Sequence, residues 1–472
     1  MMKRKWQLLI SLIILCLVLS VLFLSCNFSP RTQAIELNGA VFILLDTVRA
    51  DHLSCYGYSR ETSPNLSQLA REGVLFEQTV SYSPWTLPSV ANIFSSKQLT
   101  LDIFNKRLKQ SVVESIAKSG YATAAFTEGG YVSRHFGFDL GFSEYSEGQG
   151  KVHIQSSTSI DSNPAGGIEK TFQMAQKWLS DNRHKKFFLF IHTYEPHIPY
   201  TRRTFTKGLD PGKIKSNFFD EQLPLIRQGK MALSKPELQY LEALYDGGIL
   251  ESDRHVGSFM TFLEKIGLRD STLVVVTSDH GEEFGEHYPA NSADHGHSHH
   301  DNQLMVPLII YNPCKTYPAL KIPHQVRLMD VMPTVAELLN VPIEYTTNGK
   351  SLLPLMKREE NTGRTAYGAV VKAGPKRSFL RHLGYKYIIV TGPEIKSNYA
   401  PPKPPPPPYQ LYDLQTDPSE QVNIALAEQD ITMQMQKILF TIFTNSEEDT
   451  FTIPDVLDDK LRDRLKSLGY LP

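Results

Sequence analysis

The feature that most constrains the fold is a set of four short apolar runs. They are Ala40–Leu45, Phe187–Ile191, Thr272–Thr277 and Val306–Tyr311. A continuous apolar run, unlike one that alternates with polar residues, is typical of a strand buried on both faces of a parallel sheet. We therefore predict that these runs form strands at the centre of a layered domain.

Helical patterns separate the four runs. They cover residues 64–72, 88–94, 169–182 and 237–266. Strands that alternate with helices indicate an α/β fold, with a central, mainly parallel sheet flanked by helices. Three runs are followed by groups that can do chemistry, namely Asp46, His192 and the pair Asp279 and His280. Because ligands of such folds bind beyond the carboxyl ends of strands, we expect a site there.

The N-terminus predicts attachment to a membrane. Lys3, Arg4 and Lys5 precede an uncharged run from Leu8 to Ser25, which is 18 residues long, close to the roughly 20 that span a bilayer. The basic cluster keeps the N-terminus cytoplasmic and predicts that the rest of the chain is extracytoplasmic, at the cell surface or in the periplasm. Residues 1–26 are then a signal peptide or a membrane anchor, and a buried core helix is the third interpretation.

Within the signal-peptide interpretation, residues 23–26 resemble a bacterial lipoprotein cleavage box that ends at Cys26, although Phe23 stands where Leu is expected. The following residues 27–37 are polar and are typical of a tether. We predict a large catalytic domain over residues 38–364 and a smaller C-terminal α+β subdomain over residues 365–472. Residues 146–168 and 201–236 are polar, and we expect irregular loops there that face the substrate.

The charge balance argues against a nucleic-acid partner. Lys and Arg number 49 against 50 Asp and Glu, so the net charge is −1, whereas a dedicated nucleic-acid binder usually has a basic surplus. The charge is uneven, however, because an acidic, histidine-rich segment runs from Asp279 to His300. Asp279 and His280, followed by Gly281, predict a hard metal site at a sharp turn, and the alternative for these residues is an ordinary turn. For the last four histidines, His295, His297, His299 and His300, the alternative is a surface histidine tract.

Two further motifs carry polar groups that suit catalysis. Pro88 fits the first turn of a helix that runs to about Phe94, which places Thr86 at the helix N-terminus, where an anion is favoured. The alternative for Thr86 is an ordinary helix cap. His192 and His197 lie five residues apart in a Pro-containing loop after a strand, which suits a proton donor or ligand, and a structural histidine is the alternative.

The order of several motifs resembles that of the sulfatase family of the alkaline phosphatase superfamily. The resemblance covers residue 38 to the end of the chain and lies in the segments 46–52, 55–58, 62–66, 85–89, 192–200, 278–282, 295–296, 306–308, 330–334, 411–418 and 468–471. It implies an alkaline phosphatase-like sheet. By position, Asp46, Asp279 and His280 match the metal ligands and Thr86 matches the nucleophile. His197 matches the histidine near the leaving group, and His295 matches a group that faces the transferred anion, or a second metal in related phosphotransferases.

Thr86 departs from the family pattern, which has Cys or Ser at this position, followed by Pro and Arg. Thr cannot become formylglycine, and Val90 stands in place of the Arg, so we expect no formylglycine. Thr here is similar to the lipoteichoic-acid synthase and phosphoethanolamine transferase branches of the superfamily. A formylglycine hydrate releases sulfate by collapsing back to the aldehyde, a route that a threonine sulfate lacks. A phosphothreonine can instead be cleaved, because water or an alcohol can attack its phosphorus atom.

These observations predict a metal-dependent ester hydrolase or transferase that acts on phospho- or phosphonoesters through a covalent intermediate on Thr86. The expected cofactor is one divalent cation (Ca, Mg, Mn or Zn) held by Asp46, Asp279 and His280, with the Thr86 oxygen as a further ligand. The expected partner is an anionic ester, with lipids and glycans as the candidate carriers of the ester group. The alternatives are a sulfuric ester hydrolase similar to arylsulfatases and a non-catalytic, membrane-tethered binding protein.

Overall fold

A computed structural model of the chain describes residues 36–99, 107–148, 167–287, 293–313, 319–395, 405–444 and 451–452, together with Met2, Trp6 and Asp463. Contacts between Cα atoms divide the chain into Met1–Glu36 and Leu37–Pro472. The predicted anchor and tether lie almost wholly outside the described residues, so the boundaries at 26 and 37 stay predictions. Within the described part, no helix is both long enough and apolar enough to cross a bilayer.

A sheet of eight strands forms the centre of the second unit. In spatial order its strands are β11 (Leu320–Arg327), β2 (Val74–Val80), β10 (Met305–Tyr311), β7 (Thr272–Thr277), β1 (Gly39–Leu45), β6 (Phe187–Thr193), β4 (Ala122–Thr127) and β5 (Glu144–Glu147). All neighbours pair in parallel except β10, which is antiparallel to both β2 and β7. The predicted α/β fold with a mainly parallel sheet is confirmed, as are all four predicted strands.

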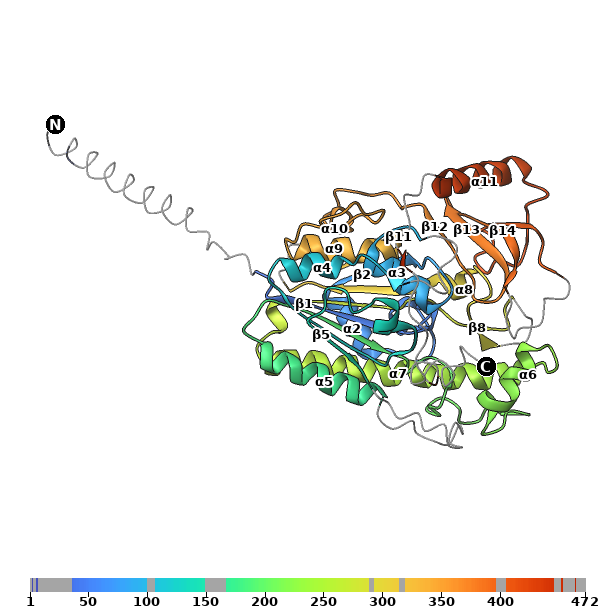
Figure 1. Ribbon diagram of the computed structural model, residues 1–472, viewed down its shortest axis with the longest axis horizontal. Coiled ribbons are helices and arrows are strands. Elements are labelled where there is room, and N and C mark those ends of the chain that lie inside the picture. The colour runs from blue at the N-terminus through green and yellow to red at the C-terminus, as the bar shows by residue number, and fades with distance from the viewer. Residues whose placement is uncertain are drawn as a thin grey trace. The chain divides into compact units, whose positions relative to one another are not determined.

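Helices cover both faces of this sheet (Figure 1). On one face lie α3 (Thr86–Ser95), α4 (Val112–Lys118), α9 (Val331–Leu338) and α10 (Leu353–Met356). The other face is covered by α2 (Pro64–Glu72), α5 (Gly167–Asn182) and the long α7 (Lys235–Lys265). The four predicted helices correspond to α2, α3, α5 and α7, within about three residues at each end.

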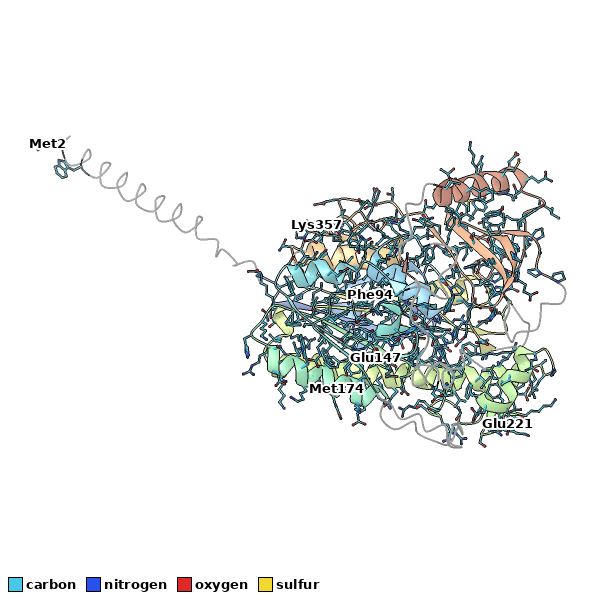
Figure 2. All side chains as sticks on the ribbon, viewed as in Figure 1. Met2, Phe94, Glu147, Met174, Glu221 and Lys357 are labelled. Atoms are coloured by element: carbon cyan, nitrogen blue, oxygen red, sulfur yellow. The ribbon has the colours of Figure 1, made fainter. Side chains whose placement is uncertain are left out.

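The strand β1 shows why its sequence forms a central strand. Its residues point alternately into two apolar clusters: Phe42 belongs to the cluster that includes residues of α3 and α9, whereas Ile43 belongs to the cluster that includes residues of α2 and α7. Both side chains are fully buried, which stabilises the fold by about 1.5–3 kcal/mol per large apolar side chain. Phe94 of α3 lies inside the molecule in the same way, whereas Glu221 and Lys357 lie at its edge (Figure 2).

The C-terminal region forms a smaller, antiparallel sheet. Its strands follow the chain order as β12 (Ala366–Ala369), β13 (Gly374–His382), β14 (Tyr385–Ile395) and β15 (Tyr409–Asp413). The helix α11 (Gln429–Thr444) packs against β13 and β14 (Figure 1). This arrangement confirms the predicted C-terminal α+β subdomain.

The predicted loop at 201–236 is only partly irregular. It contains a π-helical turn at Phe218–Gln222 and the short helix α6 (Leu223–Arg227). Most of the other predicted loop, residues 149–166, lies outside the described residues.

Candidate active site

Three predicted metal ligands meet at the carboxyl ends of β1 and β7. Asp46 is the first residue after β1, and Asp279 and His280 follow β7 within three residues. Because β1 and β7 are parallel neighbours, their ends lie side by side. One ligand atom from each of the three residues lies within 4.8 Å of the others, and all three residues are fully buried.

Local hydrogen bonds orient these ligands. The His280 Nδ1 atom lies 2.8 Å from the Gly281 carbonyl oxygen, which directs Nε2 toward the two carboxylates. The Asp279 Oδ1 atom accepts from the backbone N–H of His280 at 3.0 Å and from that of Thr47 at 3.3 Å. Fixing the ring through its second nitrogen is the usual arrangement for a metal-binding histidine.

The donor set fits a divalent cation. Asp46 Oδ1 and Asp279 Oδ2 are buried and have no hydrogen-bond partner among the described residues. Burial raises the pKa of Asp46 well above its usual range, and the charge of Asp279 acts in the same direction. Two buried carboxylates are costly without a compensating charge, and a cation with oxygen and imidazole ligands supplies it.

Thr86 lies beside this group as the first residue of α3. Its Oγ1 is 3.5 Å from Asp46 Oδ2 and 3.3 Å from His280 Nε2. The N-cap residue of α3 is Trp85, so Thr86 does not occupy the capping position that the alternative interpretation requires. The buried hydroxyl therefore lies where the helix dipole and the first backbone N–H groups favour an anion.

His197 and His295 lie together on the other side of the site. Their ring centroids are 4.9 Å apart, and the His295 ring is 4.5 Å from that of His280. Burial lowers the pKa of both His197 and His295 well below the usual range, with neighbouring histidines acting in the same direction. The His197 Nδ1 atom is 2.6 Å from the Ile198 carbonyl oxygen, a contact that fixes the orientation of the ring.

The structure thus brings together all six residues that the sequence predicted for the site. They are Asp46, Thr86, His197, Asp279, His280 and His295. His192 joins them, because its Nε2 lies 3.2 Å from Asp46 Oδ2. The roles assigned to these residues stay predictions, whereas their proximity is a feature of the fold.

Sequence reasoning missed the residues that hold His295. Glu282 approaches His295 Nδ1 with its two oxygens at 3.1 and 3.2 Å, and Tyr200 donates its hydroxyl to Glu282 at 2.6 Å. Burial raises the pKa of Glu282 to about 8. Both residues lie in segments that the sequence singled out, but no local spacing indicated their contact, which spans 82 residues of chain.

A second support for His295 comes from the insertion at 201–236. Arg227, at the end of α6, binds Asp294 through Nε at 2.7 Å and Nη2 at 3.0 Å. Asp294 Oδ1 also accepts from the backbone N–H of His295 at 3.0 Å. Burial alone would raise the pKa of Asp294, but the charge of Arg227 holds it below the usual range. The insertion therefore contributes to the geometry of the site.

The histidine tract is not a surface feature. His295, His297, His299 and His300 are each 5% exposed or less, so the surface alternative for these residues is wrong. His297 Nε2 lies 3.2 Å from Glu283 Oε2, in the short hairpin of β8 (Glu283–Phe284) and β9 (Ala293–Asp294). The tract packs this hairpin against the rest of the domain.

Comparisons with known proteins find relatives among sulfatases and phosphonate monoester hydrolases. The chain is 23% identical over 396 residues to an arylsulfatase of Clostridium perfringens, a match that covers 69% of the chain and 79% of the relative. It is 29% identical over 209 residues to the multifunctional alkaline phosphatase superfamily protein PehA of Trinickia caryophylli, covering 39% and 40% respectively. The phosphonate monoester hydrolase of Agrobacterium radiobacter has the same fold, with a TM-score of 0.67 at 20% identity, covering 87% of the chain and 96% of that structure.

Fold and site together define an ester hydrolase of the alkaline phosphatase superfamily. A family model described as Sulfatase matches residues 39–341, and the chain belongs to this family. The matched range contains every candidate site residue described above.

Proposed function

We propose that this protein is a metal-dependent hydrolase or transferase of phospho- or phosphonoesters that acts outside the cytoplasm through a covalent bond to Thr86. The observation that carries the proposal is the buried Thr86 hydroxyl, which lies at the N-terminus of α3 and within 3.5 Å of Asp46 and His280. A threonine in this position can attack phosphorus, but it cannot supply the aldehyde chemistry of a formylglycine sulfatase.

The first step is an attack by Thr86 Oγ1 on the phosphorus atom of the ester. A new oxygen–phosphorus bond forms while the bond to the leaving alcohol breaks, and the threonine proton is released. The N-terminus of α3 stabilises the negative charge on the transferred group, because its first N–H groups have no partner within the helix.

The leaving alcohol receives its proton from His197. Its Nδ1 is held by the Ile198 carbonyl, so Nε2 donates the proton as the bond breaks, a contribution of about 10²–10⁴ in rate. The bound anion raises the pKa of this ring and thereby favours the protonated form that a general acid requires. His295, oriented by Glu282 and Asp294, contacts the transferred group.

The second step releases the group from Thr86. Water, or the hydroxyl of an acceptor, attacks phosphorus, and the threonine oxygen leaves with a proton. The first outcome is hydrolysis and the second is transfer. When bound by Asp46, Asp279 and His280, with the Thr86 oxygen as a further ligand, a divalent cation neutralises charge on the transferred group and lowers the pKa of the attacking hydroxyl.

The proposed location follows from the basic cluster at residues 3–5 and the uncharged run at residues 8–25. A substrate in the membrane or at the cell surface, such as the phosphorylated headgroup of a lipid or a substituted glycan, would be within reach of an anchored enzyme. The length of the run and the residue Cys26 support a transmembrane or lipid anchor.

The test is the intact mass of the peptide that contains Thr86 after brief exposure of the Mn²⁺-loaded protein to 4-nitrophenyl phosphate or 4-nitrophenyl phenylphosphonate, followed by acid quench. We expect an adduct of the phosphoryl or phosphonyl group on Thr86. Thr86→Ala should give no adduct and lose at least about 10³-fold in kcat, whereas Thr86→Ser should retain measurable turnover.

Ser89 provides the matched control. Its hydroxyl donates to the Ser83 carbonyl at 2.7 Å and lies 3.0 Å from the Ser81 hydroxyl. Ser89 has no role in the proposed reaction, so Ser89→Ala should still form the adduct. Release of sulfate from 4-nitrocatechol sulfate without turnover of either phosphorus ester would overturn the proposal and establish the sulfuric ester hydrolase. No turnover of any of the three esters would favour the binding protein.

A further inference from the structure

The turn between β12 and β13 connects the C-terminal subdomain to the nucleophile. The Val370 carbonyl accepts from Trp85 Nε1 at 3.0 Å and from the Ser83 hydroxyl at 2.6 Å. At the end of β12, the Ala369 N–H donates to the Tyr82 carbonyl at 3.1 Å. The turn therefore holds the segment that directly precedes Thr86.

The same turn also contacts the arm that carries His295. The backbone N–H groups of Lys372 and Ala373 donate to the Gly296 carbonyl at 2.6 and 3.1 Å. Gly296 has a φ of +86°, and a Cβ there would lie 2.9 Å from Lys372 Cβ. Because Gly296 has no side chain, the aliphatic part of Lys372 lies directly against the peptide next to His295.

The Lys372 side chain is thereby buried among the groups of the site. The residue is 9% exposed, and its charge reaches both His197 and His295, whose pKa values it helps to lower. Burial lowers the pKa of Lys372 to about 7, with Arg227 acting in the same direction and Asp294 and Glu282 opposing it. Lys372 therefore lies beside the two histidines to which we assign the leaving and transferred groups.

Several charges surround the place where the transferred group would lie. The carboxylates of Asp46 and Asp279 balance a divalent cation, and Asp294 is paired with Arg227. Lys372 adds a positive charge that comes from a different subdomain than the metal ligands. A bound anion restores the charge of a buried amine, because an opposite charge nearby favours the ionised form.

We propose that Lys372 is a specificity-determining residue that favours esters whose transferred group carries two negative charges over esters whose transferred group carries one. The inference rests on the proposed function, since it concerns the group transferred to Thr86. The physical basis is that the Coulomb energy between two groups scales with the product of their charges, so a dianion gains twice what a monoanion gains at the same distance. Phosphate monoesters belong to the first class, and phosphodiesters and phosphonate monoesters belong to the second.

The test compares the binding of methyl phosphate, a dianion slightly above neutral pH, with that of dimethyl phosphate, a monoanion of similar shape, to the Mn²⁺-loaded full chain by calorimetry. We expect the wild-type protein to prefer methyl phosphate and Lys372→Met to lose roughly tenfold or more of that preference, as for the loss of a charge-assisted hydrogen bond. Lys372→Arg should keep the preference, because it keeps the charge.

Lys376→Met is the matched control. Lys376 lies four residues further along, in β13, and its side chain packs against Gly392 of β14, so the preference should not change. Thermal melting of each variant checks that it is folded. Equal preferences in Lys372→Met and wild type would overturn the inference, and so would the absence of any preference in wild type.

Turnover separates this inference from the proposed function. Lys372→Met should lose more kcat/KM for 4-nitrophenyl phosphate than for 4-nitrophenyl phenylphosphonate, two esters with the same leaving group. Selective binding without turnover of either ester would overturn the proposed function alone. Turnover with equal losses for both esters would overturn the role of Lys372 alone.

Discussion

At the scale of single residues, the site is built from charges that the fold cannot neutralise by itself. Asp46 Oδ1 and Asp279 Oδ2 have no hydrogen-bond partner within the described residues, and both side chains are fully buried. Such an arrangement costs free energy unless a cation is bound. The metal-free protein is therefore expected to be less stable than the loaded one.

Replacing Asp279 by Asn tests this expectation. Removing one of two adjacent buried negative charges should raise the stability of the metal-free protein by about 1–2 kcal/mol, because the repulsion with Asp46 disappears. It should also abolish most of the stabilisation that added Mn²⁺ gives, because a neutral amide is a weaker ligand. Thermal melting in chelator and in Mn²⁺ measures both effects. A variant that keeps the full metal-induced rise in Tm would contradict the assignment of Asp279 as a ligand.

Glu195 gives a prediction about pH. Burial raises the pKa of Glu195 to about 7, although Arg202 is its ion-pair partner. In the unfolded chain the pKa of a glutamate is about 4.3, so the folded state binds the proton more tightly. The stability that this difference provides is fully present at low pH and is lost as the pH rises toward 7.

Glu195→Gln removes this dependence. We expect the variant and the wild type to have similar stability near pH 4.5. Above pH 7 the variant should be more stable by about 1–3 kcal/mol, less than the pKa difference alone would give, because the ion pair with Arg202 favours the charged glutamate. Urea denaturation across this pH range measures the difference. A difference in stability that is the same at every pH would show that the pKa of Glu195 does not change on folding.

At the scale of secondary-structure elements, α7 positions the loop that carries Asp46. The Tyr245 hydroxyl donates to the Thr47 carbonyl at 2.7 Å and accepts from the Arg49 N–H at 2.9 Å. Thr47 has a φ of 59°, a conformation that a β-branched residue adopts only when the surrounding structure enforces it. One hydroxyl therefore holds a strained turn directly after a metal ligand.

Tyr245→Phe should loosen this turn. The loss of two buried hydrogen bonds should cost about 1–3 kcal/mol of stability and should weaken Mn²⁺ binding, measured by calorimetry, because Asp46 is held less firmly. Tyr240→Phe, in the same helix, serves as the control and should leave Mn²⁺ affinity unchanged. Unchanged affinity in Tyr245→Phe would show that β1 alone positions Asp46.

The elements also show what could be predicted from the sequence. β1, β6 and β7 were predictable because both of their faces are buried, which leaves a continuous apolar run. The antiparallel direction of β10 was not predictable, because an apolar run has the same appearance in either direction. The proximity of Asp46, Asp279 and His280 was predictable, because these residues follow strands of one parallel sheet, whereas Lys372 and Arg227 were missed. Their positions depend on contacts between segments far apart in the chain.

At the scale of the whole molecule, three regions meet at one site: the central sheet with its helices, the insertion at 201–236 and the C-terminal subdomain. The strands of the sheet lead into the predicted metal ligands, and α3 supplies Thr86. The insertion supplies Arg227, which holds Asp294, and the C-terminal subdomain supplies the turn that contains Lys372. The unit from Leu37 onward thus contains every residue to which we assign a role in the proposed chemistry.

This division predicts that anchoring and catalysis are separable. A protein that begins at Glu36 should remain in the soluble fraction after lysis, whereas the full chain should fractionate with membranes and require detergent. The two forms should have kcat/KM values for 4-nitrophenyl phosphate within about twofold of each other, because all the residues of the candidate site belong to the unit from Leu37 onward.

Incorporation of a labelled fatty acid distinguishes the two kinds of anchor. A lipid-anchored protein would carry the label and Cys26→Ser would not, whereas a transmembrane protein would carry no label in either form. A full chain that is soluble without detergent would contradict the proposed anchor, and a truncated chain that folds but is inactive would show that residues 1–35 contribute to the site.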